Sequence, residues 1–167
     1  AGILPQNMRT ILPNILSPQR GTEISRIPPN TSNTIWDRPE INELAEKIFH
    51  LSPTKEKPLL AQPSYWRVEQ NWNNGHKWHY DGCKKEGDAL VKNHMSWCGY
   101  SASILLTDPS TFTGGTFKFD NPPGSHREDH YLSAVFYSSG AHNEPQLHMV
   151  EPYSGNRTVL LFFFKTI

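Results

Sequence analysis

The first clear pattern of apolar and polar positions along the chain is that of an α-helix. Asp37 is a suitable N-cap, Pro39 falls in the first turn, and Glu40 stands at the spacing of a capping box. Apolar residues then recur three and four positions apart, which puts them on one helical face. These residues are Ile41, Leu44, Ala45, Ile48 and Phe49. We therefore expect one amphipathic helix whose apolar stripe packs on a sheet.

After Pro58 the pattern changes to short apolar or alternating runs, which are typical of β-strands. Turn signals rich in Gly, Pro and Asn separate the runs. The expected strands are 65–72, 101–107, 116–119, 131–137, 148–152 and 157–164. Many short strands preceded by one helix indicate a mainly β fold, either a sandwich or a jelly roll.

Residues 1–36 differ from the rest, because they hold five of the fourteen prolines. Proline removes a backbone donor and fixes φ, so we expect this stretch to be extended or irregular rather than helical. We accordingly divide the chain into a Pro-rich N-terminal extension, 1–36, and a single domain, 37–167. No signal peptide is visible in residues 1–20, so the compartment stays open, with the cytoplasm slightly favoured.

Composition and charge limit the partners that we expect. The longest apolar run, Val159 to Phe164, has the length of a strand, so no membrane span is predicted. The 16 basic residues balance the 16 acidic ones, so a nucleic-acid partner is not favoured. Cys83 and Cys98 could pair, but a single bridge is not a disulfide framework, and we expect two reduced thiols.

The first candidate for chemistry is His79-Tyr80-Asp81. On a strand, residues i and i+2 point to the same face, so the imidazole and the carboxylate would converge on one ion. Such a triplet also arises by chance, and the alternative is an incidental pair at the end of a surface strand.

His148 and Arg157 strengthen the metal-site interpretation. If residues 152 and 157 flank a hairpin loop, His148 and Arg157 lie on one face of adjacent strands, roughly 13 Å apart along the strand direction. Two histidines and one carboxylate form the ligand set of non-haem Fe(II) oxygenases. The planar fork of arginine binds a carboxylate through two charge-assisted hydrogen bonds.

Other histidines and glycines allow alternative interpretations. His142 is a rival to His148, although no arginine follows it at a matching spacing. His76 and His94 have polar or basic neighbours, and we expect them to be solvated surface residues. Gly114-Gly115 indicates either an ordinary turn or a backbone that passes close to the site.

Several motifs beyond residue 64 occur in the same order as in one known family. They are 72–75 leading to His79-Tyr80-Asp81, 100–109 followed by 112–117, 134–139, 147–152, and Gly155-Asn156-Arg157. At these motifs the chain resembles the prolyl 4-hydroxylase-like oxygenases, and particularly their bacterial PKHD-type branch, over roughly residues 65–164. The chain differs in its short interval from Gly75 to His79 and in an extra segment between Ser139 and Leu147.

The resemblance implies a double-stranded β-helix (jelly roll) with the N-terminal helix packed on its sheet. It also implies Fe(II) held by His79, Asp81 and His148, and 2-oxoglutarate bound through Arg157. Further candidates for holding the co-substrate are Trp72, which stands where the family often has a tyrosine, Tyr100 and Ser103. The implied reaction uses O₂ to hydroxylate a C–H bond of a peptide side chain, amino acid or other small molecule, with release of succinate and CO₂.

Three other functions stay open at this point. A jelly roll can serve as a non-catalytic binding or scaffold protein, and an intact ligand set argues against that. His/His/Asp also binds zinc in hydrolases, which have no need for a dicarboxylate clamp such as Arg157. A nucleic-acid dealkylating oxygenase is disfavoured by the zero net charge.

Overall fold

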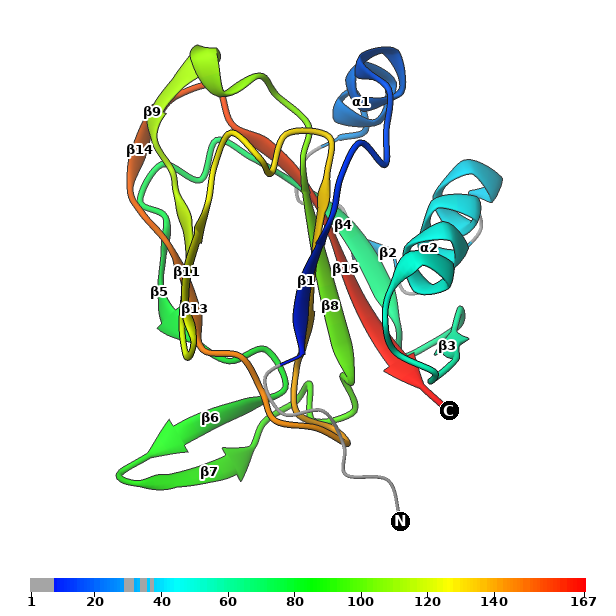
Figure 1. The fold of residues 1–167 in the computed structure, drawn as a ribbon, viewed down its shortest axis with the longest axis vertical. Coiled ribbons are helices and arrows are strands. Elements are labelled where there is room, and N and C mark those ends of the chain that lie inside the picture. The colour runs from blue at the N-terminus through cyan, green and yellow to red at the C-terminus, as the bar shows by residue number, and fades with distance from the viewer. Residues whose placement is uncertain (1–7, 29–31, 34–35, 37) are drawn as a thin grey trace.

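The computed structural model describes residues 8–28, 32–33, 36 and 38–167. Within this part, two curved sheets face each other (Figure 1), and every pairing between the named strands is antiparallel. The large sheet has the order β1 (Arg9–Leu12), β12 (Ala134–Ser138), β8 (Tyr100–Leu105), β15 (Thr158–Thr166), β4 (Tyr65–Gln70), β2 (Ser32–Asn33), and β3 (Pro58–Leu59) also pairs with β15. The small sheet has the order β11 (Pro123–His126), β10 (Phe117–Asp120), β13 (His148–Val150), β5 (His76–His79). The expected jelly roll is confirmed.

Two separate pairs of short strands complete the described strands. β9 (Phe112–Gly114) pairs with β14 (Tyr153–Gly155), and β6 (Cys83–Glu86) pairs with β7 (Ala89–Lys92). A 3₁₀ turn, Pro109–Thr111, precedes β9. The β6–β7 pair projects away from the two sheets (Figure 1). All six predicted strand segments contain a strand, with ends shifted by a few residues. The strands β1, β2, β3, β6, β7, β9, β11 and β14 were not predicted, and β5 was expected only through the triplet at its end, His79-Tyr80-Asp81.

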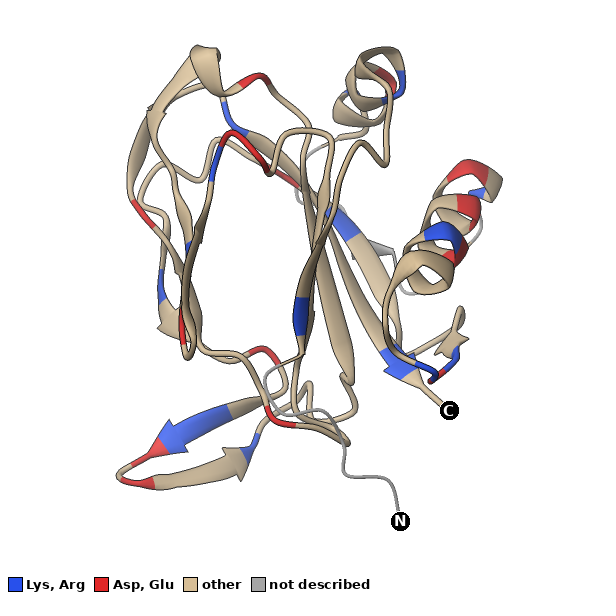
Figure 2. Cartoon of the chain, in the orientation of Figure 1, with Lys and Arg blue, Asp and Glu red and all other residues tan. Residues whose placement is uncertain are grey.

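The predicted helix is α2 (Pro39–Leu51), and its apolar stripe is buried as expected. Phe49 packs edge-on against Tyr100, Phe136 and Phe164 of the large sheet. The opposite side of α2 carries charges of both signs (Figure 2), as a solvated face should. The helix begins after Arg38, which makes no side-chain cap. The cap that we expected from Asp37 lies outside the described residues.

The expectation that residues 1–36 would lack helix is wrong. Residues Pro18–Ser25 form the helix α1, because the Ser17 side chain accepts a hydrogen bond from the Arg20 amide and Pro18 occupies the first turn, where a missing N–H costs nothing. Ile24 is buried in the same core as the apolar stripe of α2. β1 forms an edge of the large sheet next to β12. The boundary at residue 36 stays a prediction.

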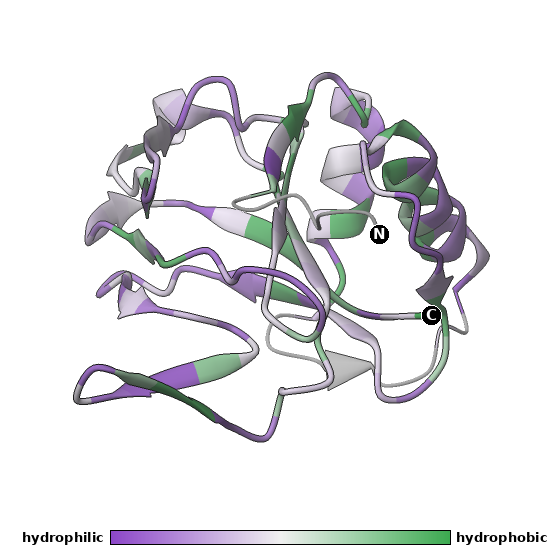
Figure 3. Cartoon of the chain, turned by 60° about the horizontal axis from the view of Figure 1, so that its bottom comes forward, coloured by the Kyte–Doolittle hydropathy of each residue, from purple (hydrophilic) through white to green (hydrophobic). Residues whose placement is uncertain are grey.

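Alternation along the central strands divides the interior into two regions. In β8 and β15 one set of side chains faces the helices and joins the main core: Tyr100, Ala102, Ile104, Leu160, Phe162 and Phe164. The intervening residues, such as Ser103 and Leu161, face the small sheet and line a pocket there. Apolar residues follow the strands of the large sheet and α2 in Figure 3. None of the described helices is long and apolar enough to cross a membrane.

Candidate functional site

Three predicted metal ligands come together at one end of the small sheet. His79 ends β5 and His148 begins β13, and the two residues stand opposite each other in the register of these strands. Their ring centres are 4.3 Å apart. One potential ligand atom from each of His79, Asp81 and His148 lies within 4.8 Å of the others. Within the described part of the chain, these three residues form the group of His, Cys, Asp or Glu side chains that could hold a metal ion.

The local conformation around Asp81 differs from the expected strand. β5 stops at His79, and Asp81 lies in a bend after it. The carboxylate reaches the histidines because the chain turns inward, not because residues i and i+2 share a strand face. Its Oδ1 lies 3.5 Å from His79 Nε2 and 3.3 Å from His148 Nε2.

Both imidazoles are oriented through their Nδ1 atoms. His79 Nδ1 lies 2.6 Å from the carbonyl oxygen of Lys77, and His148 Nδ1 lies 2.8 Å from that of Gln146. A carbonyl oxygen only accepts, so each Nδ1 donates a proton to it, and each Nε2 faces the cluster as the nitrogen available to a metal. Backbone carbonyls that fix the tautomer in this way are typical partners of metal-binding histidines.

Asp81 is held as a carboxylate. Burial alone would raise the pKa of this group, but the charge and hydrogen bonds of His148 and His79 lower it well below its ordinary value. The other oxygen, Oδ2, accepts a hydrogen bond of 2.8 Å from the Tyr137 hydroxyl. Tyr137 lies on β12 and is buried. Sequence reasoning did not single out this tyrosine, because nothing in its neighbourhood along the chain marks it as polar.

The hairpin that we expected between the segments of His148 and Arg157 is wrong. β13 pairs with β10 and β5 in the small sheet, whereas Arg157 immediately precedes β15 in the large sheet. The short strand β14 lies between them along the chain and pairs with β9. His148 and Arg157 therefore face one pocket from different sheets.

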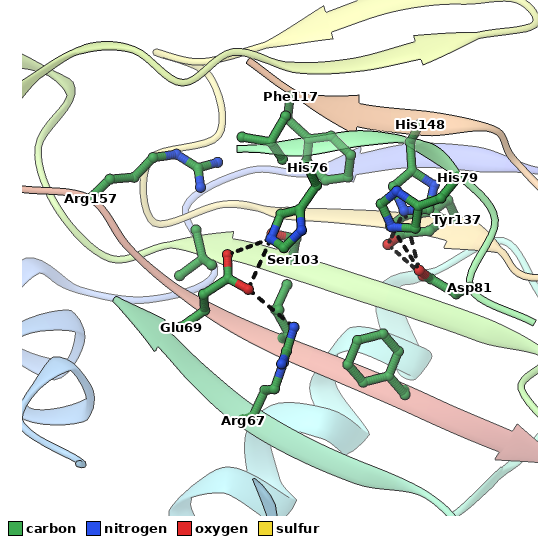
Figure 4. Close-up of a pocket in the computed structure, with 14 residues that line it drawn as sticks. Arg67, Glu69, His76, His79, Asp81, Ser103, Phe117, Tyr137, His148 and Arg157 are labelled. Carbon is green, nitrogen blue, oxygen red and sulfur yellow. Dashed lines mark hydrogen bonds and ion pairs between the residues drawn. The ribbon is translucent and has the colours of Figure 1, made fainter. Parts of the chain in front are cut away.

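That pocket lies between the two sheets and has a volume of about 100 Å³. Side chains of β4, β8, β12 and β15 line it on one side, and those of β5, β10 and β13 on the other. The three metal-ligand candidates stand at one end and Arg157 at the other (Figure 4).

Arg157 is only 3% exposed. Its backbone exchanges two hydrogen bonds with Asn71, and its guanidinium lies 5.3 Å from the centre of the Tyr153 ring. Within the described residues its Nε has no hydrogen-bond partner. Burial lowers the pKa of this guanidinium, while Tyr153 and Glu69 raise it. A buried cation with an unused donor is ready to bind an anion.

Gly115 explains how this arginine fits. A Cβ at position 115 would stand 3.0 Å from Arg157 Cδ and 3.2 Å from its Nε, and the glycine has φ of +70°. Glycine is required there on both counts. Of the two interpretations of Gly114-Gly115, the close approach of the backbone to the site is the one observed.

The structure separates the remaining co-substrate candidates. Ser103 is buried and lines the pocket. Tyr100 does not reach it: three residues away on the same strand, it faces the opposite side, stacks on Phe136 and accepts a hydrogen bond from Thr54. Trp72 is 50% exposed and stacks on His76, outside the residues that line the pocket. The assignment of Tyr100 to the co-substrate is therefore corrected.

Three polar residues of the pocket were missed by sequence reasoning. Arg67, Glu69 and His76 line it, and all three interact with one another through the Glu69 carboxylate. We expected His76 to be a solvated surface residue. A β-bulge between β5 and β13 turns both His76 and His79 inward although they are three residues apart. The alternation Arg67-Val68-Glu69 within a strand was the available signal.

The other histidines and the cysteines fall outside the site. His142 is exposed and does not belong to the metal-ligand cluster. Cys83 and Cys98 are both free, as expected. Burial raises the pKa of the Cys98 thiol to about 12, so this thiol stays protonated.

The donor set fits a divalent iron ion. Two imidazole nitrogens and one carboxylate oxygen converge from separate segments and leave coordination positions free, which is the arrangement of non-haem Fe(II) sites. The unpartnered Nε of Arg157 at the far end of the same pocket fits a carboxylate-bearing second ligand.

The solved structures that share this fold include prolyl hydroxylases and a 2OG-Fe(II) oxygenase family protein. A viral collagen prolyl hydroxylase from Paramecium bursaria Chlorella virus-1, solved with 2-oxoglutarate, aligns over 95% of this chain and 96% of its own, with TM-score 0.63 and 15% identity. A prolyl-4-hydroxylase from Pseudomonas putida aligns over 95% and 92%, with TM-score 0.58 and 14% identity. A 2OG-Fe(II) oxygenase family protein from Burkholderia pseudomallei aligns over 94% and 84%, with TM-score 0.61 and 14% identity.

No protein-family model and no curated protein sequence matches the chain. The structural likenesses, at such low identity, concern the fold. By fold and by site, the protein is a jelly roll with a two-histidine, one-carboxylate cluster between its sheets.

Proposed function

We propose that this protein is an Fe(II)- and 2-oxoglutarate-dependent oxygenase, with iron bound by His79, Asp81 and His148. The observation that carries the proposal is a single pocket with the three candidate metal ligands at one end and Arg157 at the other. Arg157 is buried there, and its Nε has no hydrogen-bond partner among the described residues. The structural neighbours, two prolyl hydroxylases and a 2OG-Fe(II) oxygenase family protein, support the same class of enzyme. The order of the sequence motifs supports the PKHD-type branch within it.

The proposed reaction replaces a substrate C–H bond by C–OH, and converts 2-oxoglutarate and O₂ into succinate and CO₂ with the second oxygen atom in succinate. Bound Fe(II) would supply the activation of O₂. His79 and His148 would present Nε2 to the metal, and Asp81 would add one negative charge. Arg157 would bind the distal carboxylate of the co-substrate, and the buried hydroxyl of Ser103 lies in the same pocket. The substrate would be a peptide side chain, an amino acid or another small molecule.

Two alternatives have less support. A zinc hydrolase would use the same three ligands, but it gives no reason for a buried arginine at the far end of the pocket. A scaffold protein would not need histidines whose Nδ1 atoms are both fixed by backbone carbonyls.

The test is the anaerobic addition of Fe(II) and then 2-oxoglutarate, with visible absorption as the readout. The proposal expects a weak charge-transfer band that requires both components. His148→Ala should abolish the band and turnover while the circular dichroism spectrum is retained, whereas the matched control His142→Ala should leave the band unchanged. An intact band in His148→Ala would refute the ligand assignment. Succinate release stimulated by individual amino acids and peptides would then identify the substrate class.

A further inference from the structure

A second carboxylate lies inside the pocket, beside the guanidinium proposed to bind 2-oxoglutarate. Glu69 projects from β4, and its side chain is only 5% exposed. In Figure 4 Glu69 lies beside His76, with Arg157 above it and Arg67 below it. Burial lowers the pKa of the Arg157 guanidinium, and the negative charge of Glu69 offsets part of that lowering. An acidic group here would repel an incoming dicarboxylate unless its charge were neutralised.

Two neighbours occupy both oxygens of this carboxylate. His76 Nε2 lies 2.9 Å from Oε1 and 3.0 Å from Oε2, and Arg67 Nη2 donates to Oε2 at 3.1 Å. Burial alone would raise the pKa of Glu69, but the hydrogen bond and charge of His76, followed by the charges of Arg67 and Arg157, lower it. Glu69 is therefore an anion whose two oxygens both have hydrogen-bond partners.

Arg67 supplies a permanent positive charge next to Glu69. Fe(II) held with Asp81 would carry a net charge of about +1, Arg157 and Arg67 add one positive charge each, and Glu69 removes one. This sum of about +2 matches a dianionic 2-oxo acid. Removing Arg67 would leave the buried Glu69 carboxylate without its hydrogen-bonded guanidinium beside the incoming dianion, which is unfavourable.

We propose that Arg67 is the counter-ion of Glu69 and sets co-substrate affinity through it, leaving Arg157 free for the dicarboxylate. Arg67 is a positioning residue in this account and does not touch the co-substrate. The proposal rests on 2-oxoglutarate being the ligand of this pocket. The competing account is that Arg67, whose Nε has no partner among the described residues, binds the co-substrate directly.

A double-mutant cycle separates the two accounts. The anaerobic Fe(II)-loaded protein is titrated with 2-oxoglutarate, and the dissociation constant is measured by calorimetry and by the charge-transfer band. Arg67→Ala should weaken binding by about tenfold or more, which is the scale of coupling between neighbouring charges. Glu69→Gln should bind as tightly as the unmodified protein or more tightly. The double variant Arg67→Ala/Glu69→Gln should recover affinity to within about threefold of the unmodified protein.

The chain offers a matched control. Arg38 and Glu40 form an ion pair of the same residue types and the same sequence spacing, on the surface and outside the pocket. Arg38→Ala should leave 2-oxoglutarate affinity unchanged. Melting temperatures of all variants are recorded, so that a loss of folding is not taken for a loss of binding.

Each outcome has one meaning. A double variant as weak as Arg67→Ala would overturn the inference, because Arg67 would then contact the co-substrate. Equal 2-oxoglutarate affinity in Arg67→Ala and the unmodified protein would also overturn it. Loss of 2-oxoglutarate binding in Glu69→Gln would overturn it as well, and this second result does not depend on whether Arg67→Ala folds. Absence of 2-oxoglutarate binding in the unmodified protein would instead refute the proposed function itself, and the inference with it.

Discussion

Removing a single hydroxyl group, in Tyr137→Phe, should weaken metal binding without altering the three ligands. The hydroxyl donates to Asp81 Oδ2 at 2.8 Å, while Oδ1 faces both imidazoles. Tyr137 thereby determines which carboxylate oxygen points toward the metal-binding nitrogens. The ring itself packs against His148, Phe117 and Phe119, and phenylalanine preserves these contacts.

The size of the effect follows from the burial and charge of this hydrogen bond. Hydrogen bonds to charged groups contribute about 1.5–3 kcal/mol, and Asp81 is a nearly buried anion with 8% of its side chain exposed. We therefore expect metal affinity to fall by about 10- to 100-fold, which is the usual consequence of losing a partner of a metal ligand. The metal-free protein should lose about 1.5–3 kcal/mol of stability.

The assay is an anaerobic Fe(II) titration against a competing chelator, with thermal unfolding of the metal-free protein in parallel. Tyr100→Phe is the matched control, because it removes a buried tyrosine hydroxyl that interacts with Thr54, outside the pocket. That variant should keep the metal affinity of the unmodified protein. If Tyr137→Phe binds Fe(II) as tightly as Tyr100→Phe does, the hydroxyl does not orient Asp81 and the reasoning fails.

Three further predictions concern the clamp, a buried histidine and the product. Arg157→Ala should weaken 2-oxoglutarate binding by about 3 kcal/mol in calorimetry and Arg157→Lys by less, because lysine cannot form the bidentate pair; equal binding by all three proteins would exclude this clamp. Burial, followed by the charge of Arg157, lowers the pKa of His130 from its ordinary value of 6.5 to about 3. Between pH 6.5 and about pH 3, His130 is therefore protonated in the unfolded chain and neutral in the folded one. Stability should therefore fall as pH drops through that window, by about 1.4 kcal/mol per unit, and His130→Gln should show a correspondingly flatter profile in denaturant titrations; identical profiles would contradict the argument. Mass spectrometry of the product formed under ¹⁸O₂ in chloride buffer should detect oxygen incorporation, because Asp81 occupies the position that chloride would need; a chlorinated product would overturn the role of Asp81.

The sequence by itself determined those features that depend on local periodicity and residue chemistry. The spacing of apolar residues identified α2 and the face that it buries, and alternating runs located six strand segments. The residue types of His79, Asp81 and His148 predicted a candidate metal site, because two imidazoles and a carboxylate suit a divalent ion, and the structure brings these three side chains together. For Gly114-Gly115 the sequence left two interpretations open, an ordinary turn or a close approach of the backbone, and the position of Gly115 beside Arg157 shows the close approach.

The tertiary structure decided what depends on how distant strands pair. Tyr100 and Ser103 share a strand, yet only Ser103 faces the pocket, since side chains three residues apart on a strand point to opposite sides. A bulge between β5 and β13 turns His76 inward. Because the two sheets face each other, Arg67 and Glu69 of the large sheet meet His76 of the small sheet in one pocket. Register between segments far apart in sequence is chosen by the packing of the whole domain, so no local pattern along the chain could reveal these contacts.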